Sequence, residues 1–147
     1  MLPHRIRGST QRERPPVLSH SAILRAAAVY NIAFGAGAVL FPGIWFDLAG
    51  LPQPNYPSLW QCIGMIVGVY GVGYWLAARD PRVHWPIVLV GLFGKVFGPI
   101  GFLMAASRGE LPWRFGFVIL TNDLVWWLPF ASILLAARRA AKSTTRA

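Results

Sequence analysis

Four apolar segments, each about 20 residues long, constrain this chain more than any other feature of its sequence. They lie at roughly Ala22–Phe41, Ser58–Ala78, Trp85–Ala106 and Phe115–Ala137. Because an α-helix rises about 1.5 Å per residue, each segment is long enough to cross the roughly 30 Å hydrocarbon core of a bilayer. The sequence therefore predicts an all-α protein whose four spans form a transmembrane up-down helix bundle.

The overall composition supports this interpretation. Of the 147 residues, 55% are hydrophobic and only 13% are charged. A soluble domain of this length has too little interior to enclose so much apolar surface, so the excess must face lipid or a permanent partner. We expect residues 22–137 to form one transmembrane domain, with basic cytoplasmic tails at residues 1–21 and 138–147. A cleaved signal peptide is the alternative for the first segment, but its apolar run is longer than a typical signal core.

The distribution of basic residues predicts how the spans are oriented. Most of the 14 Lys and Arg residues lie in the two tails and in the loop that holds Arg79 and Arg82, whereas the other side has Arg108 and Arg114. The positive-inside rule then puts both termini in the cytoplasm, as expected for a multi-pass protein of the bacterial cytoplasmic (inner) membrane. Aromatic residues are expected to form interfacial belts, with Trp45, Tyr56, Trp60 and Trp113 on the outer side and Tyr74, Trp75 and Trp85 on the inner side.

The positions of the basic residues, the cysteine and the histidines exclude several functional classes. The net charge of +9 would suggest nucleic-acid binding in a soluble domain, but the basic residues are placed as juxtamembrane anchors, so no nucleic-acid partner is expected. The single cysteine, Cys62, cannot form a dithiol pair or a thiolate zinc site. The histidines lie outside the apolar segments and are not placed to ligate a haem there, so no cofactor or metal is identified.

Small residues indicate the faces on which the helices pack. At steps of three and four residues they form three series, which are Ala27, Asn31, Gly35 and Ala38, then Gly64, Gly68 and Gly71, and then Gly91, Gly94, Gly98 and Gly101. Each series falls on one helical face and permits the close backbone approach by which helices associate in lipid. The series predict a tight monomeric bundle, and a dimerisation surface is the alternative.

Two ionisable residues lie deep within the apolar segments. Lys95 falls at the centre of the third segment, and Asp123 lies about 4.5 Å outward of the centre of the fourth. A charge near the bilayer midplane costs at least about 2.5–3.5 kcal/mol, and pairing would relieve both charges. Because a short loop joins the two segments, we expect them to be antiparallel neighbours with Lys95 and Asp123 forming a buried pair.

Further polar and aromatic side chains lie near this pair along the expected helices, namely Asn31, Gln61, Asn122, Trp126 and Trp127. With Lys95 and Asp123 they could form a small polar centre covered by indole rings. Two interpretations have equal weight: an internal ion pair that only fixes helix register, and a binding site for a ligand or a proton. A third is that some of these residues face a partner subunit.

Three stretches of the chain resemble those of a family of small bacterial four-helix membrane proteins of undefined role, namely Pro54–Gly71, Gly94–Gly101 and Thr121–Trp127. More loosely the chain is similar to the DoxX-like group, whose members are sometimes labelled alkyl hydroperoxide reductase. The resemblance implies the four-helix fold and no catalytic residue. Cys62 gives the peroxidase label no support, because it is alone, inside a helix, and without the setting that lowers a thiol pKa.

The sequence thus favours a non-enzymatic membrane protein that binds a small amphiphile, such as a quinone or a lipid, or assists a membrane partner complex. The alternative is a proton-coupled transporter or an intramembrane enzyme. In that case the carboxyl group of Asp123 would exchange the proton, and Lys95 would tune the proton affinity of that group.

Overall fold

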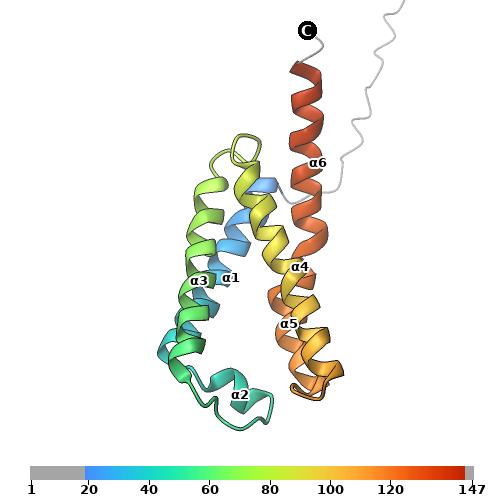
Figure 1. The fold of residues 1–147 in the computed structure, drawn as a ribbon. Helices are drawn as coiled ribbons and strands as arrows, with labels where there is room; N and C mark the ends of the chain where they lie inside the picture. The colour runs from blue at the N-terminus through green and yellow to red at the C-terminus, as the bar shows by residue number, and fades with distance from the viewer. Residues whose placement is uncertain (1–18, 145–147) are drawn as a thin grey trace, which may run out of the picture.

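The computed structural model describes residues 19–144, so the expected N-terminal tail lies almost wholly outside the described residues. Within this part of the chain the elements are helical and there is no strand (Figure 1). They are α1 (His20–Leu40), α2 (Ile44–Leu48), α3 (Pro57–Ala77), α4 (Trp85–Ser107), α5 (Gly116–Asn122) and α6 (Trp127–Thr144), with 3-10 turns at Trp113–Phe115 and Leu124–Trp126. The all-α prediction is confirmed, and four helices are long and apolar enough to cross a membrane, the fourth being the bent run Trp113–Ser143.

The helix ends follow from local sequence signals. The Ser19 hydroxyl caps α1 by accepting a hydrogen bond from the backbone N–H of Ala22 at 3.1 Å. The helix then ends at Leu40, and Phe41 leaves helical geometry because the ring of Pro42 disfavours a helical residue directly before it. Helix α3 begins with Pro57, at a position where a missing N–H costs nothing.

The helices form two pairs that lie side by side (Figure 1). Helix α1 packs along α3, and α4 packs against α5 and α6. The first pair is held at close range by glycines: a Cβ atom added to Gly35 would lie only 2.5 Å from the carbonyl oxygen of Gly64. One added to Gly64 would lie 2.7 Å from the Cβ of Ala38. The predicted packing of these two small-residue series is therefore confirmed, and the contact is made within one chain.

The glycine series in α4 behaves differently from the prediction. A Cβ added to Gly91 would collide with the ring of Tyr74, and one added to Gly98 would lie 2.8 Å from Asp123 Oδ2. Gly94 and Gly101 have nothing within 4 Å of that position. Gly91 and Gly98 thus make room for particular side chains, and the α4 series does not form one continuous helix-packing seam.

The fourth apolar segment is not one continuous helix. Helix α5 ends at Asn122, and Asp123 departs from helical geometry with φ −120° and ψ −63°. A 3-10 turn follows before α6 begins, and Pro129 lies in the first turn of α6. Because proline has no N–H to give to the carbonyl four residues earlier, it suits the start of a new helix better than the middle of an old one. The break therefore falls at the acidic residue of the predicted centre.

Two apolar clusters form the core. One contains Leu24, Ala27, Ala28, Tyr74, Ala77, Ala78, Val88, Phe130 and Ile133. The other contains Phe34, Ala49, Phe102, Ala106, Phe115 and Val118. Along each participating helix the polar residues Asn31, Lys95 and Asp123 fall between members of the two clusters, so a polar layer separates two apolar ones.

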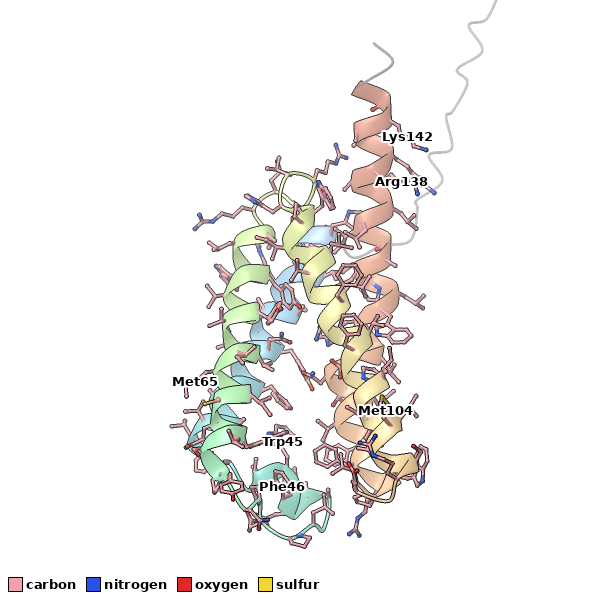
Figure 2. All side chains as sticks on the ribbon, viewed as in Figure 1. Trp45, Phe46, Met65, Met104, Arg138 and Lys142 are labelled. Atoms are coloured by element: carbon pink, nitrogen blue, oxygen red, sulfur yellow. The ribbon has the colours of Figure 1, made fainter. Side chains whose placement is uncertain are left out.

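The expected aromatic belts are only partly matched by exposure. Tyr56, Trp75, Trp85 and Trp113 are exposed, as belt residues should be. Tyr74 is 1% exposed and belongs to the core, so its assignment to the inner belt is wrong. Trp45 and Trp60 pack against the second cluster, and the ring of Trp45 stacks on Phe34 at 4.6 Å. Short helix α2 carries Trp45 and Phe46 at the end of the molecule opposite the C-terminus of α6 (Figure 2).

The two ends of the molecule differ in how they carry charge. Helix α6 extends well past the ends of α3 and α4, and Arg138 and Lys142 lie on this extension (Figure 2). The first part of the expected C-terminal tail is therefore helical, up to Thr144. At the other end Arg108 pairs with Glu110 at 2.6 Å, and this hydrogen bond holds the pKa of the exposed Glu110 carboxyl below its usual value.

Candidate functional site

Lys95 is a buried cation held by a main-chain carbonyl. Its side chain comes from the middle of α4 and is 4% exposed, and its Nζ donates a hydrogen bond to the carbonyl oxygen of Asn122 at 2.5 Å. In a continuous helix that carbonyl would accept the N–H of Trp126. Here the N–H of Trp126 donates to the carbonyl of Asp123 at 3.1 Å instead. The helix break thus exposes the acceptor that the lysine uses.

Asp123 is equally buried, at 5% exposure, but it does not bond to Lys95 directly. Its Oδ1 accepts a hydrogen bond from Nδ2 of Asn122 at 2.9 Å, and its Oδ2 lies against Gly98. Across residues 19–144 the one ion pair within 4.0 Å is that of Arg108 and Glu110. The expectation of a direct Lys95–Asp123 ion pair is therefore wrong, because each group is bonded through Asn122, one to its carbonyl and the other to its amide.

A cavity of about 190 Å³ lies where the two helix pairs meet, and both Lys95 and Asp123 line it. Its other walls are Asn31, Ile66, Val67, Tyr70, Tyr74, Gly91, Gly94 and Asn122. Asn31 comes from α1 and is 3% exposed, and its Oδ1 has no hydrogen-bond partner in the structure. The Oδ1 of Asn122 is buried without a partner as well. A buried unsatisfied polar group costs about 1–3 kcal/mol, so this wall favours a ligand that donates hydrogen bonds.

Trp126 and Trp127 contact Lys95 but do not line the cavity. Pro99 cannot supply the N–H that the carbonyl of Lys95 would accept in a regular helix, and Nε1 of Trp127 donates to this carbonyl at 3.0 Å. The ring centroid of Trp126 lies 5.9 Å from Nζ of Lys95, within the range of a cation–π contact. Trp126 and Trp127 thus tie the broken fourth span to α4.

Gln61 does not belong to the centre, so that part of the sequence prediction is wrong. Its Nε2 donates to the carbonyl oxygen of Val39 at 2.9 Å and joins α3 to the end of α1. Tyr70 and Tyr74 line the cavity from α3, although neither was predicted to belong to the centre. Their spacing of four residues, together with Ile66, places all three on one helical face, and this periodicity could have revealed them.

The donors and acceptors in the cavity suit binding of a small polar group. Lys95 supplies donors, whereas Asp123 and the free amide oxygens of Asn31 and Asn122 supply acceptors.

Cys62 is exposed on α3 and does not line the cavity. Among the described residues no group of three His, Cys, Asp or Glu side chains could hold a metal ion. No family model, curated protein or solved structure matches this chain.

Proposed function

We propose that this chain is a four-span protein of the bacterial cytoplasmic membrane that binds a small amphiphile in the cavity between its helix pairs. The polar head of the ligand would enter between Lys95 and Asp123, and its tail would extend into the bilayer. The observation that carries this proposal is the cavity, which combines a buried cation, a buried carboxylate and two unpartnered amide oxygens with an apolar wall. We also propose that the chain belongs with the DoxX-like four-helix proteins that it resembles.

The placement in a membrane is supported by the apolar surface. Large apolar side chains stand exposed along all four candidate spans, among them Val29, Ile32, Ile63, Ile66, Val69, Phe93, Phe97, Ile100, Leu120, Leu128 and Leu135. In water such a surface would drive aggregation, whereas lipid solvates it. The excess of Lys and Arg on one side favours cytoplasmic termini.

The size and chemistry of the cavity favour a ring-shaped head such as that of a quinone. An apolar cavity of about 150 Å³ can hold benzene, so one of about 190 Å³ has room for a single six-membered ring and little more. A quinone carbonyl would accept from Lys95, and the hydroxyl of the reduced quinol would donate to Asn31 or Asp123. A lipid headgroup is the other amphiphile that these groups could bind, and assistance to a membrane partner complex is compatible with either ligand.

A proton-coupled transporter or intramembrane enzyme is the second candidate, and the broken fourth span favours it. In many transporters, discontinuous helices expose backbone carbonyls at the midplane, beside the groups that bind substrate or protons. Here the break falls at Asp123 and exposes the carbonyl of Asn122 to Lys95. In this mechanism Asp123 would exchange the proton, and Lys95 would move between the carbonyl and the carboxylate.

A binding measurement with a matched pair of glycine variants tests the proposal. The probe is a short-chain ubiquinone added in its reduced quinol form, whose hydroxyls can donate to the free amide oxygens, to the purified protein in lipid nanodiscs, with tryptophan fluorescence as the readout. Gly94 lines the cavity and has open space at its Cβ position, so Gly94→Val should fill part of the cavity, whereas Gly101→Val makes the same change at an open position of α4 outside the cavity. We expect Gly94→Val to weaken binding at least about tenfold and Gly101→Val to leave it unchanged. Equal binding by both variants would refute the cavity as the site.

One further variant separates the two candidate functions. Asp123→Asn keeps an oxygen that can accept from the amide of Asn122 but removes the exchangeable proton. If the protein is a binding protein, this variant should still bind the quinone. If it is a proton-coupled transporter, proton movement into vesicles containing the wild-type protein should be measurable and should vanish with Asp123→Asn.

A further inference from the structure

A second pocket brings two arginines together at one end of the α1–α3 pair. It has a volume of about 340 Å³ and is lined by Arg25, Trp75, Ala78 and Arg79. Arg25 lies in the second turn of α1, and Arg79 follows the end of α3. Because α1 and α3 are joined by a loop at the other end and run antiparallel, these two positions come from the same end of the pair.

Within the part of the chain that the structure describes, no carboxylate balances these two guanidinium groups. The one ion pair there is that of Arg108 and Glu110, at the opposite end of the molecule. Asp80 follows Arg79, but its Oδ1 accepts from the backbone N–H groups of Arg82 and Val83. Two like charges that share one pocket repel each other, so the pocket has the electrostatics of an anion site.

The shape and walls of the pocket narrow the class of anion. Guanidinium groups present parallel N–H donors that match the oxygens of a phosphate. The remaining wall, from Trp75 and Ala78, is apolar, and Trp75 is 48% exposed on the outer surface of α3. An indole in this position is typical of the membrane interface, where lipid phosphates and the first acyl carbons meet. A free phosphate would leave this apolar wall unused.

We propose that this pocket binds the phosphate of an anionic phospholipid from the cytoplasmic leaflet. Arg25 and Arg79 donate hydrogen bonds to the phosphate oxygens, and the indole of Trp75 packs along the glycerol and the start of an acyl chain. The inference rests on the proposed insertion and orientation in the membrane, and it is independent of the Lys95 cavity. It gives Arg25 a role at the surface of the bundle, apart from the polar centre.

The test measures lipid binding to the purified, detergent-solubilised protein by native mass spectrometry. The probes are phosphatidylglycerol, phosphatidylcholine and inorganic phosphate. The double variant Arg25→Gln/Arg79→Gln removes both guanidinium groups from the pocket. The matched control Arg138→Gln/Arg139→Gln removes the same charge from α6, and circular dichroism confirms that both variants stay helical.

We expect the wild-type protein to bind phosphatidylglycerol in preference to phosphatidylcholine. The Arg25/Arg79 variant should bind phosphatidylglycerol at least about tenfold more weakly, and the control should lose much less. Arg25→Lys/Arg79→Lys should recover only part of the affinity, because lysine keeps the charge but lacks the forked donors. Equal losses in the variant and the control would overturn the site in favour of general surface charge, as would full competition by inorganic phosphate at lipid concentrations.

The outcome can be separated from that of the proposed quinone function. The Arg25/Arg79 variant should bind the short-chain ubiquinone as the wild type does, since neither residue lines the Lys95 cavity. A protein that binds no quinone but still selects phosphatidylglycerol through these arginines would refute the quinone proposal alone. A protein that binds quinone but shows no lipid preference would refute the lipid site alone.

Discussion

Lys95 is bonded to the main chain of Asn122, with Nζ 2.5 Å from the carbonyl oxygen, and not to the carboxylate of the adjacent Asp123. The lysine and the helix break therefore depend on each other. The break frees the carbonyl of Asn122 from its helical partner, and the lysine supplies the donor in its place. Asp123 remains in the same cavity, where it supplies the opposite charge without a direct bond.

The first prediction is a coupling between the charges of Lys95 and Asp123. Lys95→Met should lower stability by about 3–5 kcal/mol, because it leaves the carboxylate of Asp123 uncompensated and the carbonyl of Asn122 unpaired. Asp123→Asn keeps the hydrogen bond from Asn122 and should cost less. The double variant should be more stable than the sum of the two losses predicts, by at least about 1 kcal/mol.

Chemical denaturation in mixed micelles measures this cycle. The double variant should not recover fully, since the carbonyl of Asn122 still lacks its donor. Additive losses would show that the two charges do not interact and that the cavity is more solvated than its burial indicates.

The second prediction concerns the contact between Gly98 and Asp123. A methyl group at residue 98 would lie 2.8 Å from Asp123 Oδ2, so Gly98→Ala must displace the carboxylate or spread α4 from the fourth span. We expect weaker ubiquinone binding and a lower melting temperature for Gly98→Ala. Gly101→Ala, in open space on the same helix, should change neither quantity by a comparable amount. A normal melting temperature for Gly98→Ala would show that the carboxylate has room to move.

The third prediction concerns the close contact between α1 and α3. A Cβ at residue 35 would lie 2.5 Å from a backbone oxygen of α3, and backbone atoms cannot move aside as a flexible side chain can. Gly35→Ala should therefore lower the melting temperature markedly, with a loss of about 1–3 kcal/mol typical of overpacking. Gly37→Ala is the control, because nothing lies within 4 Å of its added methyl group. Similar melting curves for both variants would mean that the helices do not meet at Gly35.

The fourth prediction concerns orientation in the membrane. In a Cys62→Ala background, Asn55→Cys should react with an impermeant thiol reagent in intact cells, because positive-inside orientation places this loop outside. Arg82→Cys should react only after the cells are opened. Labelling at residue 82 but not at residue 55 in intact cells would reverse the proposed orientation and would place the Arg25–Arg79 pocket at the outer leaflet.

The sequence by itself determined three long apolar helices, the apolar length of the fourth run and the residues that are polar near the centres of these segments, but not the break in the fourth run at Asp123. These features are local: hydrophobic length, proline positions and helix caps act within one segment. The α1–α3 contact could also be predicted from the sequence. Glycines such as Gly35 and Gly64 recur on one face of each helix, and such a face is where helices approach most closely.

The tertiary structure alone decided which partners the polar residues take. Lys95 has a long side chain that can reach either a carboxylate or a carbonyl, and only the position of the break relative to α4 selects the carbonyl. Gln61 donates a hydrogen bond to the carbonyl of Val39, and the ring of Tyr74 packs against Gly91 and Phe130. Both sets of contacts join segments that lie far apart in the chain. Such choices depend on helix rotation and on the space that neighbours leave, which the residue pattern of one segment does not specify.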